Sequence, residues 1–423
     1  MAEGSGRVRQ RRVFHIPGYD PFPARRYREL YRKEAAAQAE ISGYRIAVKG
    51  VEGASGTWVV ATETDGAQAR ARVDVLTWSD IVQDSMAGSI PATYWQMLTT
   101  ALIYLRSGTL RRLMMLRKGP VIAAFYPVAM LLGQLALALI VAGVLGGLVE
   151  SGLLTVAALV VGTEGTVYDT VTWIGWVLNW AIFIALTVVI LRWCKAQDHR
   201  LYAYYLMHDY AFSAGRDGAY PQAMEDRLQD FRSTLAAAMT DDVDEVLIVG
   251  HSSGAHLAVS IVADMVRAGL IKGDGPRLAL LTLGQVIPML SFLPRARRLR
   301  GDLALLQDCE AITWVDVSAP GDGCSFALCD PVAVTGLAKE GKRWPLVISA
   351  AFTQTLSPAR WKALRWRFFR LHFQYLCAFD RPGDYDYFQI TAGPQTLAAR
   401  YAGRGPSGSR IDVPVSKYTS VQS

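Results

Sequence analysis

The chain has 423 residues, of which 51% are hydrophobic and 19% are charged, and its 44 Lys and Arg outnumber its 37 Asp and Glu. This composition excludes a disordered or low-complexity protein. Soluble globular chains contain about a quarter charged residues, so the deficit indicates that part of the chain never faces water. The five cysteines are odd in number and lack the spacing of a disulfide framework, which favours a reducing compartment.

Residues 1–118 predict the first part of an α/β domain. Strands are expected at 12–16, 44–48 and 71–78, and a helix is expected at 23–40. A loop must follow the first strand, because Pro17 and Gly18 end it abruptly. We expect no cleavable signal sequence, because the apolar run after the first basic residues is too short.

Two uncharged stretches, 119–149 and 170–191, predict a pair of transmembrane helices. Each exceeds the roughly 20 apolar residues that a bilayer requires, and tryptophans suited to the membrane interface lie in the second. The alternative is a pair of buried core helices, but such helices seldom stay apolar on every face. Residues 119–192 are therefore interpreted as a membrane hairpin.

The charges beside the hairpin predict its orientation. Basic residues flank both of its ends, namely Arg106, Arg111, Arg112, Arg117 and Lys118 before it and Arg192, Lys195 and Arg200 after it. The connector contains Glu150, Glu164 and Asp169 and no Lys or Arg. Because positive residues mark the cytoplasmic side, we expect an integral protein of the inner (cytoplasmic) membrane with two spans, whose folded domain and both termini are cytoplasmic.

Residues 193–402 predict the second part of the same domain. Pro221 opens a helix, and a strand at 245–249 precedes a helix at 255–269. Two further strands are expected, at 278–283 and 312–317. This alternation predicts a mostly parallel sheet flanked by helices.

Strands on both sides of the hairpin favour one interrupted domain, because 1–118 alone is short for an α/β core. Two separate soluble domains are the alternative. Residues 403–423 are rich in Gly, Ser and Pro and predict a flexible tail.

The most specific motif is Gly250-His251-Ser252-Ser253-Gly254, placed directly between a predicted strand and a predicted helix. A serine on a sharp strand-to-helix turn exposes its hydroxyl, and the flanking glycines leave room for that turn. The helix N-terminus and the backbone N–H of Ser253 can stabilise developing negative charge. Ser252 is therefore the predicted nucleophile.

In this context the motif resembles the α/β-hydrolase superfamily, especially the serine lipases and esterases with a GHSxG sequence. The resemblance implies an α/β-hydrolase-like fold, interrupted here by the hairpin, and an acid and then a histidine after the nucleophile. Of the two histidines that follow Ser252, His256 lies one turn into the helix, away from the acid loop. His372 is therefore the expected base.

The resemblance places the acid on a loop after a strand, and Asp322 lies on such a turn after the strand at 312–317. Asp316, within that strand, and Asp330, which could start a turn, are the alternative acids. In the implied mechanism His372 takes the proton of Ser252, Asp322 orients the imidazole, and an acyl-enzyme forms and is hydrolysed.

The second oxyanion donor is expected from the loop at 15–20. This loop is similar in place to the His-Gly motif of the family, but Ile16 and Pro17 are inserted. Because Pro17 has no N–H, the backbone N–H of Tyr19 is the expected donor, together with that of Ser253.

The stretch 361–376 is basic and aromatic, and it predicts an amphipathic helix at a membrane surface. In such a helix His372 would be an interfacial residue without a catalytic role, whereas a loop after the final strand, which is normal in the fold that the resemblance implies, would allow it to be the base. For the basic and aromatic residues themselves, the alternatives are a solvated basic helix or an RNA-binding patch. The predicted hairpin favours lipid contact over nucleic acid.

No cofactor or metal is expected. Residues 336–342 match the first part of a phosphate-binding loop motif. However, Arg343 replaces the required Ser or Thr, and Pro345 interrupts the helix that such a loop must open. Cys324 and Cys329 lack zinc-ligand spacing.

The sequence therefore predicts a membrane-anchored serine hydrolase that cleaves an acyl ester, with a lipid as the favoured substrate. Thioesterase, amidase or acyltransferase chemistry would use the same triad. The altered oxyanion loop motivates an alternative, a non-catalytic membrane scaffold with a hydrolase-like fold. A channel or transporter subunit is disfavoured, because two spans without charged residues offer no pathway.

Overall fold

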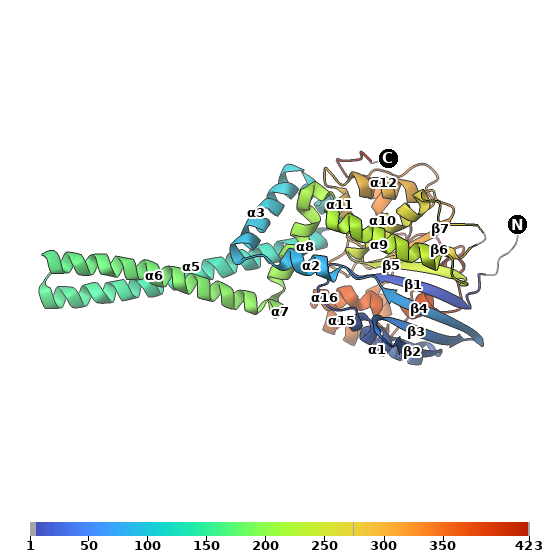
Figure 1. The fold of residues 1–423 in the computed structure, drawn as a ribbon, viewed down its shortest axis with the longest axis horizontal. Coiled ribbons are helices and arrows are strands. Elements are labelled where there is room, and N and C mark those ends of the chain that lie inside the picture. The colour runs from blue at the N-terminus through green and yellow to red at the C-terminus, as the bar shows by residue number, and fades with distance from the viewer. Residues whose placement is uncertain (1–5, 274, 422–423) are drawn as a thin grey trace. The chain divides into compact units, whose positions relative to one another are not determined.

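A computed structural model describes residues 6–273 and 275–421 (Figure 1). The chain separates into two compact units: the sheet unit, made of the chain up to Ser85, 102–123 and the chain from Ser213 on, and the helical unit, made of 86–101 and 124–212. Residues 86–101 and 193–212, which were predicted to belong to the α/β domain, are thus part of the helical unit.

The sheet unit contains one eight-stranded sheet in the order β2-β3-β4-β1-β5-β6-β7-β8. The strands are β1 (Gln10–Ile16), β2 (Arg45–Val51), β3 (Ala54–Thr64), β4 (Ala67–Val75), β5 (Glu245–His251), β6 (Arg277–Leu283), β7 (Ile312–Ser318) and β8 (Leu346–Ser349). The run from β4 to β8 is parallel, and β2 and β3 are antiparallel additions. Because β1 pairs with β5, strands from before and after the apolar helices form a single sheet, as predicted.

Two strands, β3 and β8, were not predicted. β8 has four residues, which is too short for a recognisable period. In β3 the buried residues Trp58 and Val60 alternate with exposed residues. Gly56 and several threonines make this alternation of apolar and polar residues hard to detect in the sequence. In the structure β3 pairs with β2 and β4, its neighbours in the chain, and β8 pairs with β7.

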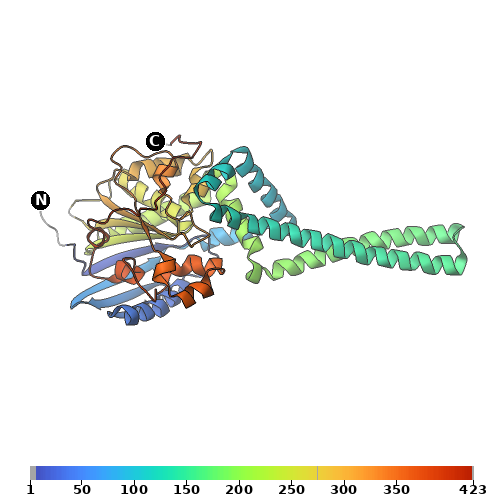
Figure 2. The same cartoon turned by 180° about the vertical axis from the view of Figure 1, so that it is seen from behind.

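Helices cover both faces of the sheet (Figures 1 and 2). On one face α10 (Gly254–Arg267) packs against β5, with α9 (Gln222–Ala238) and α12 (Arg297–Leu306) beside it. On the other, α1 (Arg25–Ser42) packs against β2 and β3, and α17 (Tyr387–Ala392) against β1, β3 and β4. The shorter helices of this unit are α2 (Ser79–Met86), α4 (Thr109–Leu116), α11 (Ile287–Ser291), α13 (Pro331–Val334), α14 (Phe352–Thr355), α15 (Pro358–Leu364), α16 (Phe368–His372) and α18 (Leu397–Arg400).

The helical unit contains two long apolar helices that run side by side (Figures 1 and 2). They are α5 (Lys118–Val161) and α6 (Thr166–Ala196), with mean hydropathies of 2.5 and 2.3 over their most apolar windows. Both are long and apolar enough to span a membrane, and they contain the predicted spans. Most of α3 (Ile90–Arg106), α7 (Asp198–Leu201) and α8 (Ala203–Ala214) complete this unit.

The basic-aromatic stretch is not one helix, in contrast to the prediction. It consists of α15, α16 and a 3-10 turn at Phe373–Leu376. Arg367, with φ −103° and ψ 68°, lies outside the helical region and separates α15 from α16. The packing of this segment on the sheet unit overrides its helical periodicity.

The predicted flexible tail is also a correction, apart from 422–423, which lie outside the described residues. Ile411 donates its N–H to Leu328 O at 2.8 Å and pairs with Cys329 in a short bridge. Val415 donates to Val334 O at 3.1 Å. Gly, Ser and Pro prevent regular structure here, but backbone hydrogen bonds hold the segment against the sheet unit.

Candidate active site

Ser252 occupies a sharp turn between β5 and α10. Its φ of 56° lies in the left-handed region, which a residue with a side chain rarely adopts, and its N–H donates to Leu283 O at 2.9 Å. A Cβ at Gly250 would lie 2.6 Å from Gly254 O, so only glycine lets β5 and α10 approach this closely. The geometry is that expected of a strand-to-helix turn that presents a serine hydroxyl.

The loop that follows β1 lies directly against this turn. A Cβ at Gly254 would collide with the backbone carbonyls of Ile16 and Pro17, and a Cβ at Gly18 would lie 3.0 Å from Ser252 Cβ and 3.4 Å from its Oγ. Trp78 Nε1 donates to Pro17 O at 3.0 Å and holds the loop in place. The segment expected to contribute the Tyr19 N–H is therefore adjacent to Ser252, and Ser253 is the N-cap of α10.

Asp322 and His372, which are 50 residues apart, are brought into contact. His372 Nδ1 lies 2.8 Å from Asp322 Oδ2, and the two residues are 6% and 2% exposed. Cys324 N donates to Asp322 Oδ1 at 2.9 Å. Burial opposes ionisation of Asp322, but the positive charge available on His372 and the hydrogen bonds together outweigh it, so the pKa of Asp322 is lowered.

Two residues not predicted for the site support this pair. Tyr375 donates its hydroxyl proton to Asp322 Oδ2 at 3.0 Å and accepts the N–H of Ala319 at 2.9 Å. His251 Nε2 lies 3.0 Å from the carbonyl oxygen of His372, and the two imidazole rings are 4.8 Å apart. Burial, followed by the charge of His372, lowers the pKa of His251 well below its ordinary value, so its neutral ring can donate through Nε2.

Ser252 and His372 lie at the same end of β6. Leu283 O accepts the Ser252 N–H, and a Cβ on the next residue, Gly284, would lie 3.1 Å from His372 Cε1. His372 Nε2 is buried and has no hydrogen-bond partner among the described residues. The acid and the histidine are therefore paired, whereas no hydrogen bond joins Ser252 Oγ to the imidazole.

The alternative acids are engaged elsewhere. Asp316 accepts a hydrogen bond from Thr282 Oγ1 at 2.6 Å, and burial raises its pKa to about 8, so it is largely neutral at pH 7. Asp330 caps α13 and forms an ion pair with Lys342 at 2.6 Å. Of the three candidates, Asp322 alone is placed beside His372 by these contacts.

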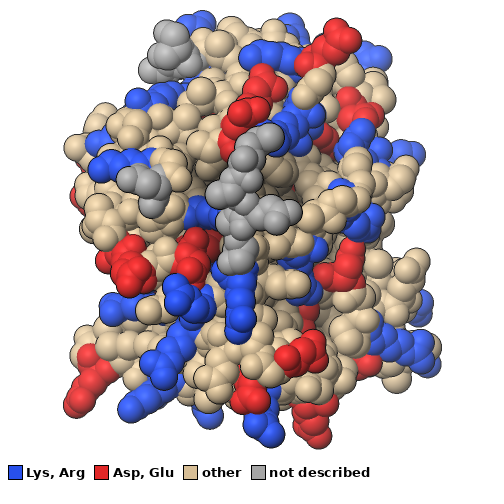
Figure 3. Space-filling view, turned by 90° about the vertical axis from the view of Figure 1, so that its right-hand side faces the viewer, with Lys and Arg blue, Asp and Glu red and all other residues tan. Residues whose placement is uncertain are grey.

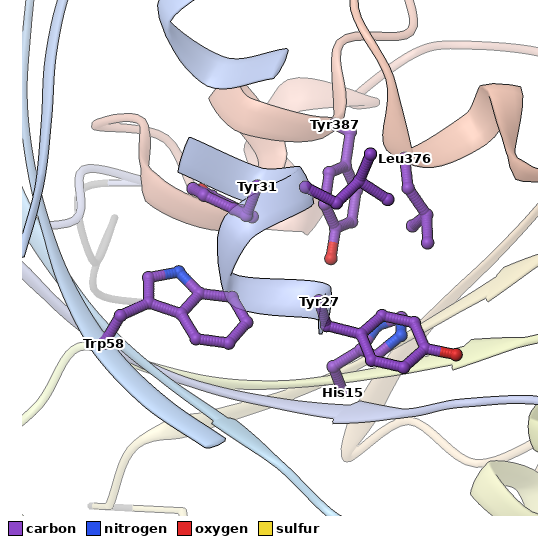
Figure 4. A pocket seen from close by; sticks show the side chains of 7 residues that line it. His15, Tyr27, Tyr31, Trp58, Leu376 and Tyr387 are labelled. Atoms are coloured by element: carbon purple, nitrogen blue, oxygen red, sulfur yellow. The ribbon is translucent and has the colours of Figure 1, made fainter. Parts of the chain in front are cut away.

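Two other buried histidines lie near the site. His256 Nδ1 is 3.0 Å from Tyr220 Oη, and burial lowers its pKa to about 3. His15, near the end of β1, has no hydrogen-bond partner for either ring nitrogen among the described residues, and burial lowers its pKa to about 3 as well. It faces a small cavity (Figure 4), which is lined by His15, Tyr27, Leu30, Tyr31, Trp58, Leu376 and Tyr387.

One group of side chains could hold a metal ion. Ligand atoms of Asp322, Cys324 and His372 all lie within 4.8 Å of one another, and oxygen, sulfur and nitrogen donors suit zinc. These residues include the Asp–His pair, so a metal at this place would compete with the proton that joins Asp322 to His372. A chelator distinguishes the two arrangements.

Comparisons of the chain with protein families, with curated proteins and with solved structures find no match. The chemistry of the site must therefore be argued from its geometry. A serine on a strained turn, an imidazole paired with a buried carboxylate, and a helix N-terminus beside them form a set of groups able to perform acyl transfer.

Proposed function

We propose that the protein is a membrane-anchored serine hydrolase with an α/β-hydrolase-like fold, which cleaves an acyl ester, with a lipid as the favoured substrate. The observation that carries the proposal is the left-handed backbone of Ser252 at the junction of β5 and α10. Such a conformation costs about 1–3 kcal/mol and is concentrated at functional sites. Beside it lies an imidazole already paired with a buried carboxylate.

In the proposed reaction His372 Nε2 takes the proton from Ser252 Oγ as the oxygen attacks the acyl carbonyl carbon. Asp322 accepts the Nδ1 proton, which keeps Nε2 basic and stabilises the imidazolium. The backbone N–H groups of Ser253 and Tyr19 stabilise the oxyanion. His372 then returns the proton to the leaving alcohol, and water hydrolyses the acyl-enzyme by the same steps.

The missing Ser252–His372 hydrogen bond fits a site without substrate, because such bonds often tighten only when substrate binds. The buried Nε2 of His372 has no other partner among the described residues, so nothing competes with Ser252 for it there.

We also propose that α5 and α6 cross the membrane as a hairpin. Their basic flanks and the acidic connector support a cytoplasmic location of the sheet unit under the positive-inside rule. The external segment is then short, and all groups of the proposed site belong to the cytoplasmic side.

Labelling with a fluorophosphonate probe tests this function on the full chain in detergent. We expect wild-type labelling, none in Ser252→Ala, and a loss of about 10³-fold or more in His372→Ala, because the serine loses its base. Ser233→Ala, an exposed position on α9, is the control. Labelling should survive a chelator, whereas its loss would favour a metal site.

The alternative is a non-catalytic membrane scaffold with a hydrolase-like fold. The observation that favours it is the altered loop after β1, where Ile16 and Pro17 are inserted and Pro17 has no N–H to donate. A folded wild-type protein that no fluorophosphonate labels would support the scaffold and contradict the hydrolase.

A further inference from the structure

The segment around α15 and α16 is unusually cationic. From residue 341 to residue 379 the chain contains seven Lys and Arg and no Asp or Glu. On the face of the protein shown in Figure 3, by contrast, basic and acidic side chains are interspersed. A segment of this length whose charges are all positive therefore differs from that face of the protein and favours an anionic partner.

Aromatic side chains in this segment are exposed among the cations. Trp366 is 70% exposed and Phe368 is 48% exposed. The residues that form this surface, called the basic-aromatic surface below, are Lys362, Arg365, Trp366, Arg367, Phe368 and Arg370. Its four cations form no ion pair with an acidic side chain within the described part of the chain. Unpaired cations beside exposed aromatic rings are typical of segments that bind at the headgroup level of a bilayer.

The basic-aromatic surface adjoins the acid turn of the proposed active site. A Cβ at Gly321 would lie 2.6 Å from the Trp361 ring, and a Cβ at Gly323 would lie 3.5 Å from the Phe368 ring. These two glycines flank Asp322. The exposed face of the segment therefore lies one side chain away from the residue that orients His372.

The same turn also contacts the start of the first apolar helix. A Cβ at Gly119, in the first turn of α5, would lie 3.6 Å from Gly323 Cα, and both residues belong to the sheet unit. The uncharged stretch begins at this point of α5. The basic-aromatic surface is thus adjacent to the place where the chain enters its apolar stretch, which favours a lipid bilayer as the occupant over a soluble protein.

We propose that the basic-aromatic surface binds anionic phospholipid headgroups at the cytoplasmic face of the membrane, and that the proposed site takes its ester substrate from that bilayer surface. The cations attract the phosphates, and Trp366 and Phe368 insert at the level of the headgroups. The substrate class is accordingly an acyl ester that resides in the membrane. This inference rests on the proposed function for its substrate, but the lipid contact itself does not require catalysis.

Photo-crosslinking of the full chain in lipid nanodiscs tests the contact directly. Trp366 is replaced by benzoylphenylalanine in a Ser252→Ala background, and the discs contain phosphatidylcholine with or without phosphatidylglycerol. We expect lipid adducts at position 366, with higher yield in the anionic discs. The same probe at Val59, an exposed residue of β3, is the control and should give none.

Reversal of two charges on the basic-aromatic surface tests whether its cations attract the anionic lipid. Arg365→Glu with Arg367→Glu should lower the adduct yield in anionic discs about tenfold, because each cation near an anionic surface contributes several-fold to binding. Arg45→Glu, an exposed position on β2, should leave the yield unchanged.

Adducts with protein at position 366, or no adducts, would overturn the lipid contact. These outcomes are distinguishable from failure of the proposed function, because labelling of Ser252 by a small fluorophosphonate in detergent needs no bilayer. Lipid adducts together with an unlabelled Ser252 would keep the contact and reject the hydrolase. A second assay uses unlabelled wild-type enzyme, after a separate sample has shown that its Ser252 reacts with the fluorophosphonate. If this enzyme hydrolyses an ester in the discs no faster after anionic lipid is added, the proposed substrate route is rejected.

Discussion

The two halves of the proposed active site are organised to different degrees. On the acid side, Asp322 accepts hydrogen bonds from three groups, and both it and His372 are buried. On the nucleophile side, Ser252 is half-buried and no hydrogen bond joins its hydroxyl to the imidazole. The fold alone thus pairs His372 with Asp322, whereas Ser252 is held by backbone geometry, and under the proposed function we expect it to reach the imidazole only when substrate is bound. The experiments below test this division.

Of the variants considered, the one that removes the charge of Asp322 should lower the catalytic activity the most. Asp322→Asn keeps the shape of the residue but favours the wrong imidazole tautomer, so kcat/KM for ester hydrolysis should fall about 10⁴-fold. Asp316→Asn is the matched control, because this buried carboxyl within β7 is already largely neutral at pH 7. Equal losses in the two variants would show that burial of an acid, and not the Asp322–His372 pair, is what matters.

Tyr375 is a positioning residue on the acid side, and its hydroxyl tests how far that side is preorganised. Tyr375→Phe removes one donor to Asp322 and should lower kcat/KM about tenfold, the effect of one hydrogen bond to a charged group. The pH–rate profile should also shift, because the carboxylate of Asp322 loses one of the hydrogen-bond donors that share its charge.

The control is Tyr385→Phe, because this buried hydroxyl donates to Tyr375 O at 2.7 Å and does not touch Asp322. It should leave the pH profile in place. A profile that shifts equally in both variants would assign Tyr375 a general structural role.

His15, on the nucleophile side, should affect the stability of the fold and its pH dependence, and should leave the Asp322–His372 pair in place. Its pKa is about 3 in the folded protein against an ordinary 6.5, so below pH 6.5 the unfolded chain binds a proton that the folded chain does not. Stability of the wild type should therefore fall as the pH is lowered from 6.5 toward 3, by up to about 1.4 kcal/mol per pH unit from this group.

In His15→Phe that contribution should disappear. Urea unfolding followed by tryptophan fluorescence across this pH range measures the slope, with the exposed His199→Phe as control. Identical slopes for wild type and His15→Phe would mean that His15 takes up a proton in the folded state, for example through a water in the adjoining cavity.

The local sequence was sufficient to predict those elements whose residue pattern is short and continuous in the chain. The strands β1, β5, β6 and β7 and the two apolar helices follow from apolar runs and alternation. Gly250 and Gly254 predict the sharp turn at Ser252, because the close approach of β5 and α10 allows no Cβ at these positions. The break between α15 and α16 at Arg367 depends instead on packing. The last segment is attached by hydrogen bonds to Leu328 and Val334. Composition therefore misled both predictions.

The candidate site divides in the same way. The motif was sufficient to name Ser252. The resemblance, which implies an acid and then a histidine after the nucleophile, named Asp322 and His372 as candidates. That Asp322 rather than Asp316 or Asp330 meets His372, and that Tyr375 and His251 support the pair, was decided by tertiary structure. The physical reason is that a period of apolar residues encodes which face of an element is buried, whereas a contact between side chains 50 residues apart depends on how several elements pack together.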